Sequence, residues 1–365
     1  MENKKTCLYS KHIGLNAQIC PFGGFDMPIQ YSGIEAEHNA VREHCGIFDV
    51  SHMGEVTIDG PEAENFIQYI FSNDVSKSTE GKILYGMMLN THGGVVDDLL
   101  VYCKANKSYL LVINAANINK DLAWILEQSK SFDVIIKNRS DDFGQVAIQG
   151  PESEEKITSL LNIECSDLSF YTFKTIDVGN ERVIISRTGY TGEDGFEIYG
   201  SPKYINTIWD TIVNNGITPC GLGCRDTLRF EVGLPLYGDE LSDDITPIEA
   251  GLGMFVKTDK LKFVGKNAIL KQKSEGTKRK LVGIELNNED KAIPRHGYEI
   301  EKDGHLIGYV TTGYRSISTG KSVCMALIES SYKEIGTQVD VKIHKRLHSG
   351  TIVKRAFYNK HYVKQ

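Results

Sequence analysis

The sequence has no apolar run long enough to cross a membrane, and its charged N-terminal residues are not followed by an apolar stretch. A membrane helix needs about 20 apolar residues, and a secretory signal needs an apolar segment behind its charges. We therefore expect an intracellular, cytoplasmic protein with no membrane partner. The chain has 365 residues, of which 41% are hydrophobic, so it is long enough for two or three domains with apolar cores.

Clustered cysteines are also absent. The eight cysteines are irregularly spaced, and the closest pair, Cys220 and Cys224, has three residues between its members. A zinc site needs a second close pair or nearby histidines, so the sequence predicts reduced, mostly buried thiols and no metal.

Two phosphate-binding motifs are incomplete. Gly221–Asp226 lacks the third glycine of a dinucleotide fingerprint, and Thr319–Ser322 lacks the first glycine of a phosphate loop.

Acidic residues are missing from residues 341–365, which contain seven Lys and Arg. The whole chain has a net charge of −7, so residues 1–340 carry −14, which is −7 minus +7. This asymmetry suggests an anionic partner or substrate, and lysines that protect a sheet edge explain it equally well. No nucleic-acid motif accompanies the charge, so we expect no nucleic-acid partner.

An internal repeat indicates how the N-terminal part of the chain is organised. Residues 54–64 and 144–154 share an alternating strand, a glycine turn and a Pro–Glu start to a helix. Proline at the first helical position and acids in the first turn suit the helix dipole. We infer two related α+β units, over about 51–134 and 140–220.

From about residue 280 the pattern changes to short alternating strands, such as 280–286 and 305–312. Asp303-Gly304 is a strong signal for a hairpin turn between two of these strands. The C-terminal part is therefore predicted to be a separate antiparallel β-barrel or sandwich.

The most informative residues are Asp97 and Asp98, in an apolar strand that follows the glycine turn at Gly93 and Gly94. Successive strand side chains point to opposite faces, so one of the two carboxylates faces inward. An inward carboxylate must be hydrogen-bonded or paired, because burying it alone is costly. Taken alone, the pair suits the mouth of a hairpin as well as a carboxylate held for a substrate.

Several segments together closely resemble one family, the T-proteins of the glycine cleavage system, which are aminomethyltransferases. The resemblance extends over nearly the whole chain, and DVSHMGE at 49–55 and SRTGYTGEDGFE at 186–197 are its most specific parts. The other matching segments are 22–28, 93–99, 114–117, 221–226 and 246–253.

The resemblance implies an α+β cloverleaf of three domains, in which two related α+β domains surround a central folate cavity and a β-barrel or sandwich follows. The first domain would comprise 1–50 and 135–240, the second 51–134 and 241–275, and the third 280–365. The implied one-carbon reaction transfers the methylene of an aminomethyl group on the lipoylated H-protein to tetrahydrofolate. It releases ammonia and forms 5,10-methylenetetrahydrofolate.

The resemblance also implies residue roles. Asp98 would be the catalytic aspartate beside the folate nitrogens, with Asp97 as its structural neighbour. Glu197 would grip the pterin ring through paired N–H bonds, and Asn114 would contact the same ring. Arg225 would hold a carbonyl or carboxylate of the ligand.

Three side chains, Met53, Tyr85 and Tyr190, would enclose the aromatic middle of folate, although each also suits an apolar core. Lys364 would lie nearest to the folate tail. The chain departs from the family pattern at Phe170, where close relatives have tyrosine, and this loses a hydroxyl. Phe25 stands where tryptophan is common. A second hypothesis is a folate-binding protein without transferase activity, although such relatives lack the paired carboxylates.

Overall fold

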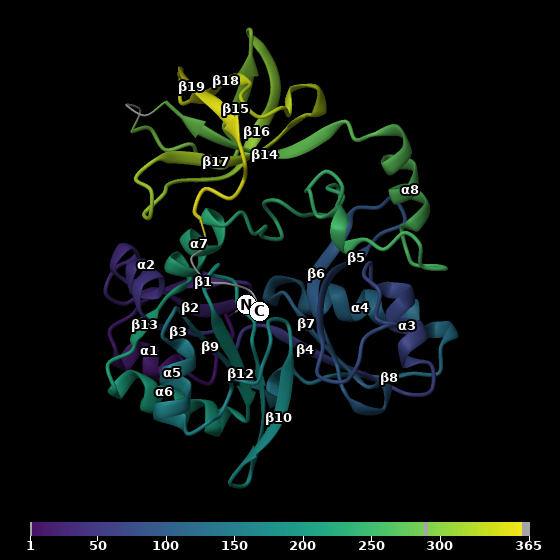
Figure 1. Ribbon diagram of the computed structural model, residues 1–365, viewed down its shortest axis with the longest axis vertical. Helices are drawn as coiled ribbons and strands as arrows, with labels where there is room; N and C mark the ends of the chain where they lie inside the picture. The colour runs from purple at the N-terminus through teal and green to yellow at the C-terminus, as the bar shows by residue number, and fades with distance from the viewer. Residues whose placement is uncertain (1, 288–290, 360–365) are drawn as a thin grey trace.

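The computed structural model describes residues 2–287 and 291–359. It has three lobes: two sheets with their helices lie side by side, and a β-barrel lies across one end of both (Figure 1). The mixture of helices and strands confirms the predicted α+β class. Within the described ranges, no helix is both long and apolar enough to cross a membrane. All eight cysteines are free and six of them are buried, as predicted.

The first lobe contains a six-stranded sheet with the strand order β10-β11-β12-β9-β3-β13. Its strands are β3 (Gly46–Asp49), β9 (Gly144–Gln149), β10 (Phe173–Val178), β11 (Glu181–Ser186), β12 (Gly195–Gly200) and β13 (Thr218–Cys220). The helices around it are α1 (Tyr9–Gly14), α2 (Ile34–Glu43), α5 (Ser153–Leu161), α6 (Pro202–Asn214) and α7 (Leu222–Glu231), and β1 (Gln18–Phe22) and β2 (Phe25–Gln30) form a separate hairpin. Ile148 and Ile198 of the sheet pack with Ile208 and Trp209 of α6 in the largest core of this lobe.

The second lobe contains a five-stranded sheet with the order β5-β6-β7-β4-β8. Its elements are β4 (Gly54–Asp59), α3 (Ala63–Ile70), β5 (Ile83–Leu89), β6 (Val95–Cys103), β7 (Tyr109–Ile113), α4 (Ile118–Gln128) and β8 (Ile135–Asn138). The antiparallel order β5-β6-β7-β4 matches β10-β11-β12-β9 of the first lobe, as the repeat would require. One boundary differs from the prediction: β8 pairs with β4, so residues 135–138 belong to the second sheet and not to the first domain.

The third lobe is a closed barrel, which decides between the two predicted β architectures. Its strands are β14 (Arg279–Leu286), β15 (Glu299–Lys302), β16 (His305–Arg315), β17 (Ser322–Glu329), β18 (Gln338–Ile343) and β19 (Arg346–Val353). The predicted turn joins β15 to β16, and both of its residues are left-handed, with φ of 51° at Asp303 and 78° at Gly304. This conformation is the one that Asp-Gly hairpin turns favour.

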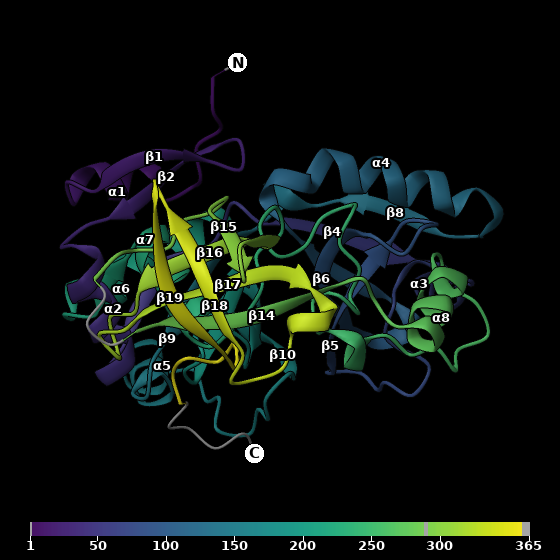
Figure 2. The same cartoon turned by 90° about the horizontal axis from the view of Figure 1, so that it is seen from above.

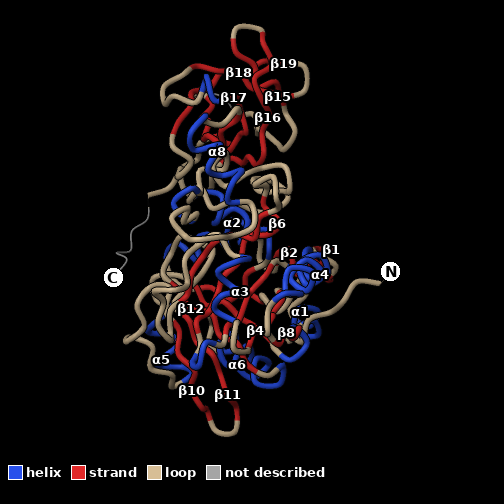
Figure 3. The backbone as a smooth tube through the Cα atoms, turned by 90° about the vertical axis from the view of Figure 1, so that its right-hand side faces the viewer, coloured by secondary structure: helices blue, strands red, loops and turns tan. Residues whose placement is uncertain are grey.

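A shared apolar cluster joins the three lobes. It includes Met87 and Val95 of the second sheet, Phe230 of α7, and Leu281 and Met325 of the barrel. Helix α8 (Lys266–Glu275) lies above α3, nearer the barrel, at the outer side of the second lobe (Figure 1), so the two helices overlap in the view from above (Figure 2). The side view shows the barrel strands standing beyond both sheets (Figure 3). The second sheet, helix α7 of the first lobe and the barrel thus meet in one apolar cluster.

Candidate active site

The alternation of side chains along β6 separates the two aspartates, as the sequence predicts. Leu99 and Val101 lie in the core between the second sheet and its helices. Leu100 and Tyr102 lie on the opposite face, in a cluster that also contains Tyr199 of β12. Because side chains two apart share a face, Asp98 lies on the side of the sheet that faces the first lobe. Asp97, by contrast, is completely buried on the helix-covered side.

The carboxylate of Asp98 is half-buried and is held by two side chains. The Tyr85 hydroxyl donates to Oδ2 at 3.0 Å, and the Asn114 amide donates to Oδ1 at 3.0 Å. Burial, followed by the nearby charge of Asp97, raises the pKa of Asp98 to about 7. The two hydrogen bonds oppose this rise because they stabilise the ionised form. Asp98 is therefore poised to exchange a proton near neutral pH, which suits a general base.

Asp97 anchors the segment that carries Asn114. Its carboxylate accepts hydrogen bonds from the backbone N–H of Asn114 at 3.0 Å, the Asn114 amide at 2.8 Å and the Asn117 amide at 2.7 Å. Asp121 lies one helical turn after Asn117 and is completely buried. Burial and the nearby Asp97 carboxyl group raise the pKa of Asp121 to about 10. Asp121 therefore keeps its proton at neutral pH.

A close backbone approach fixes the start of β6. A side chain at Gly94 would place a Cβ atom 1.7 Å from the carbonyl oxygen of Asp243, so only glycine fits there. The next residue, Val95, donates its N–H to the carbonyls of Ser242 and Ile245, at 2.9 and 3.1 Å. The glycines before the aspartate pair thus allow the 242–245 segment to pack against the strand that carries Asp98.

Glu197 occupies the corresponding face of β12. Its neighbours Phe196 and Ile198 are in the first lobe's core, so the carboxylate points toward the second lobe. Thr188 donates to Oε2 at 2.5 Å, and Gln145 donates to Oε1 at 3.2 Å. Burial raises the pKa of Glu197 above its ordinary value. A carboxylate has about four acceptor positions, so two remain for a ligand.

A direct hydrogen bond joins the two facing sheets. The hydroxyl oxygens of Tyr102 in β6 and Tyr199 in β12 are 2.9 Å apart. Tyr102 also lies 3.1 Å from the hydroxyl of Ser186, which stands opposite Glu197 in the paired strand β11. Asp98 and Glu197 therefore face the same space between the lobes, from opposite sheets.

Tyr190 and Arg225, which belongs to α7, stack on each other in the first lobe. The guanidinium of Arg225 lies 4.5 Å from the centroid of the Tyr190 ring, and the Tyr190 hydroxyl donates to the carbonyl of Pro235. Burial lowers the pKa of Arg225, and the charge of Glu197 opposes that change. Asp98 and Arg225 also both influence the pKa of Tyr190, which burial raises. Tyr190 thus links the Asp98 and Glu197 parts of the site.

The other residues singled out from the sequence make apolar or aromatic contacts. Met53 is half-buried and packs against two apolar clusters, one within the first lobe and one between the sheets. Phe170 packs edge-on against Tyr171, with ring centroids 4.5 Å apart. Phe25 lies edge-on to His52, whose pKa burial and nearby Arg225 lower to about 4, so that imidazole is neutral. Lys364, the weak candidate for the folate tail, lies outside the described residues.

The sequence alone did not identify four supporting residues. Gln145 and Thr188 hold Glu197, Asn117 holds Asp97, and Asp121 lies close enough to Asp97 for its own pKa to be raised. The only available signal was spacing: Asn117 and Asp121 are four residues apart, so they share a helix face. Within the described ranges, no three His, Cys, Asp or Glu side chains are grouped to hold a metal.

Comparisons with known proteins extend over the whole architecture. Residues 8–260 match the family described as the GCVT N-terminal domain, and residues 279–359 match the glycine cleavage T-protein C-terminal barrel domain. The aminomethyltransferase of Caldanaerobacter subterraneus is 50% identical over 99% of this chain and 97% of its own. That of Thermoanaerobacter pseudethanolicus is 48% identical over all of both chains. The crystal structure of the glycine cleavage system aminomethyltransferase from Bartonella henselae has a TM-score of 0.93, at 29% identity over 99% of each chain.

Proposed function

Since the chain belongs to the glycine cleavage T-protein family and is an aminomethyltransferase, we propose that the Asp98 site binds tetrahydrofolate as the acceptor and receives the aminomethyl group from the lipoylated H-protein. The observation that carries the proposal is the Asp98 carboxylate, which is held by Tyr85 and Asn114 with a pKa of about 7. The names of the relatives favour a transferase over a protein that only binds folate.

The proposed reaction makes two carbon–nitrogen bonds and breaks two bonds of the donor. Two nitrogens of tetrahydrofolate become joined through the methylene carbon, and that carbon separates from the lipoyl sulfur and from the amine. The two protons lost by the folate nitrogens end on the thiol and on ammonia. Asp98 is the group that accepts a proton from the attacking nitrogen and then balances the positive charge that develops there.

The other residues of the site position the acceptor. Glu197 presents two free acceptor positions to the aminopyrimidine edge of the pterin, while Thr188 and Gln145 fix its orientation. Arg225 is placed to bind a carbonyl or carboxylate of the ligand, since its guanidinium stacks on the Tyr190 ring and interacts with the charge of Glu197. Met53, Tyr85 and Tyr190 supply the apolar walls, and Asn114 orients Asp98.

The test is ammonia release from aminomethylated H-protein in the presence of tetrahydrofolate. We expect Asp98→Asn to lower turnover by about 10²–10⁴-fold, the usual contribution of general acid–base catalysis. Folate affinity and melting temperature should stay close to those of the unmodified protein, because asparagine keeps the size of the side chain. Asp177→Asn, an exposed substitution in β10, is the matched control and should retain full activity. Full turnover by Asp98→Asn would refute the role of this carboxylate.

A further inference from the structure

Tyr102, in β6, is completely buried although its ring ends in a polar hydroxyl. Side chains two residues apart share a face of a strand, so Tyr102 lies on the same face as Asp98, about 13 Å further along β6. The proposed reaction gives Tyr102 no role, and a buried hydroxyl is costly unless it is hydrogen-bonded. The partners of this hydroxyl therefore indicate what Tyr102 contributes to the site.

The Tyr102 hydroxyl belongs to a continuous chain of hydrogen bonds that ends at Glu197. Thr188 donates to Glu197 Oε2 at 2.5 Å, and the hydroxyls of Thr188 and Ser186 are 2.7 Å apart. The Ser186 hydroxyl is 3.1 Å from that of Tyr102, which is 2.9 Å from that of Tyr199. None of these five residues is more than 7% exposed. The hydroxyl groups must therefore satisfy one another in place of water.

The carboxylate at the end of the chain sets the direction of its hydrogen bonds. In the form that binds ligand N–H groups Glu197 is ionised, so it can only accept, and the single hydroxyl proton of Thr188 is committed to it. Thr188 then accepts from Ser186, and Ser186 accepts from Tyr102. The backbone carbonyl of Glu197 is a poorer acceptor for Ser186, because it is 3.4 Å away. Tyr102 is therefore the donor that supports the other two hydroxyls.

This chain crosses from one lobe to the other at Tyr102. Ser186, in β11, stands opposite Glu197 in the paired strand β12 of the first lobe. Tyr102 comes from β6 of the second lobe (Figure 1). The Gln145 amide, the other donor to Glu197, belongs to β9 of the first lobe. Of the two donors to Glu197, Thr188 is therefore the one that is linked to the strand carrying Asp98.

We propose that Tyr102 is a positioning residue for the acceptor: through Ser186 and Thr188 it orients the Glu197 carboxylate toward the aminopyrimidine edge of a pterin. The inference rests on the proposed function and adds a residue that touches neither the ligand nor the reacting atoms. Because β6 carries both Tyr102 and Asp98, the carboxylate that holds the pterin and the carboxylate that acts on it are fixed to one strand. A pterin held by Glu197 then presents its reacting nitrogen to Asp98.

The experiment compares two variants that lose the same hydrogen bond between the lobes. Tyr102→Phe and Tyr199→Phe both remove the bond between these two hydroxyls, but only Tyr102→Phe also removes the bond to Ser186. We expect Tyr102→Phe to weaken the binding of tetrahydrofolate, measured by calorimetry, by about tenfold, and Tyr199→Phe to weaken it by less than about twofold. Ser186→Ala interrupts the chain at the next hydroxyl and should reproduce the loss. Equal losses in the two tyrosine variants would indicate a merely structural bond and overturn the inference.

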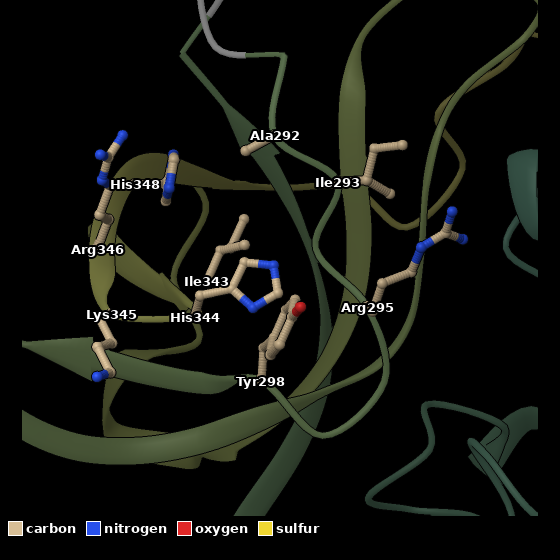
Figure 4. A pocket seen from close by; sticks show the side chains of 9 residues that line it. All are labelled: Ala292, Ile293, Arg295, Tyr298, Ile343, His344, Lys345, Arg346 and His348. Atoms are coloured by element: carbon tan, nitrogen blue, oxygen red, sulfur yellow. The ribbon is translucent and has the colours of Figure 1, made fainter.

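Tyr298 provides a control for the loss of a tyrosine hydroxyl elsewhere in the molecule. Its ring lies edge-on to that of His344, with centroids 5.7 Å apart, in a barrel cavity of about 670 Å³. Figure 4 shows the two side chains next to each other. The turn that carries His344 is at the end of the barrel farthest from β6 (Figure 1). Tyr298→Phe should therefore bind tetrahydrofolate as the unmodified protein does.

A double-mutant cycle with Glu197→Ala distinguishes an effect through Glu197 from a general loss of stability. If Tyr102 acts through Glu197, Tyr102→Phe should cause no further loss of tetrahydrofolate affinity once Glu197→Ala is present. An analogue of tetrahydrofolate without the 2-amino group lacks one donor to Glu197, so Tyr102→Phe should weaken its binding less. Losses that simply add in the double variant would overturn the inference.

The same measurements separate this inference from the proposed function. Unchanged affinity of Glu197→Ala for tetrahydrofolate would refute the placement of the pterin at Glu197, and the inference with it. Loss of affinity in Glu197→Ala with none in Tyr102→Phe would overturn the inference alone. Loss in both, with none in Tyr199→Phe or Tyr298→Phe, supports it.

Discussion

At the scale of single residues, the site contains three neighbouring carboxyl groups, Asp97, Asp98 and Asp121. Asp121 keeps its proton because burial raises its pKa to about 10. Burial, followed by the charge of Asp97, raises the pKa of Asp98 to about 7. The Asn114 amide donates hydrogen bonds to both Asp97 and Asp98, so a substitution at Asp97 also affects how Asn114 holds Asp98. The pKa of Asp98 is thus raised in part by a residue on the opposite face of its own strand.

This arrangement predicts the pH dependence of the reaction. In the proposed mechanism the active form of Asp98 is the carboxylate, so the rate should fall as pH decreases through about 7, where Asp98 becomes protonated. Asp97→Asn removes the neighbouring charge, so the pKa of Asp98 should fall and the acid limb of kcat/KM should move down by about one pH unit. Asp121→Asn replaces a neutral carboxyl group by a neutral amide and should leave the limb in place. Profiles of both variants, measured between pH 5 and about 9, check this.

The opposite pattern would contradict the assignment. If Asp121→Asn moved the acid limb and Asp97→Asn did not, the charge of Asp97 would not be what raises the pKa of Asp98.

The sequence predicted that Asp97 and Asp98 lie on opposite faces, but it did not predict that Asp121 lies beside Asp97. Strand alternation was enough to place Asp97 and Asp98 on opposite faces, because that rule depends only on neighbouring residues. The position of Asp121 beside Asp97 depends on how α4 packs on β6, which no local pattern contains.

At the scale of elements, a buried carboxylate ties the first lobe to the barrel. Glu231, the last residue of α7, accepts hydrogen bonds from the hydroxyls of Ser316 and Ser318, each at 2.6 Å, beyond the end of β16. It also lies 3.2 Å from both His38 and Arg42 of α2. Although burial opposes ionisation, these partners lower the pKa of Glu231 to about 2. One side chain therefore joins two helices and a barrel loop.

We expect Glu231→Gln to lower the free energy of unfolding by about 3 kcal/mol, because it leaves buried cationic and hydroxyl partners poorly matched. Since the folded pKa is depressed, the contribution of the ionised group is present above the ordinary glutamate pKa and is lost as pH falls from about 4 to 2. The difference from the unmodified protein should therefore shrink in that range. Urea titrations at pH 7 and near pH 3 measure it. Glu329→Gln, an exposed change in β17, is the control, and an equal effect there would contradict the role of Glu231.

Elements were predicted best where their pattern is local. The barrel hairpin followed from Asp303-Gly304 because both residues accept positive φ. The second sheet was cut short at residue 134 because β8 is exposed along most of its length and lacks clear alternation. It is a strand because β4 offers a free edge to pair with, and pairing partners are not visible in a single segment.

At the scale of the whole molecule, the segment after the last barrel strand returns to the first lobe. The Phe357 ring packs against Phe230 of α7 with centroids 5.2 Å apart, and its backbone N–H donates to the carbonyl of Glu231 at 2.8 Å. Arg355 donates to the carbonyl of Ala250 at 2.6 Å. The chain thus closes the barrel onto the α+β lobes with residues that follow the barrel in sequence. The positive charge of this segment was visible in the sequence, whereas this packing role was not.

Phe357→Ala should therefore lower the free energy of unfolding by about 2–3 kcal/mol, as expected for a partly buried aromatic ring. It should also allow the barrel to unfold separately from the α+β lobes. The two tryptophans, Trp124 and Trp209, lie in α4 and α6, so their fluorescence reports only the α+β lobes, while circular dichroism reports every lobe. In urea the two signals should coincide for the unmodified protein and separate for Phe357→Ala, with the barrel unfolding at the lower concentration. Leu306→Ala, which truncates a 60% exposed barrel side chain, should leave them coincident. If Phe357→Ala shifted both signals together, the three lobes would unfold as one unit that does not depend on this contact.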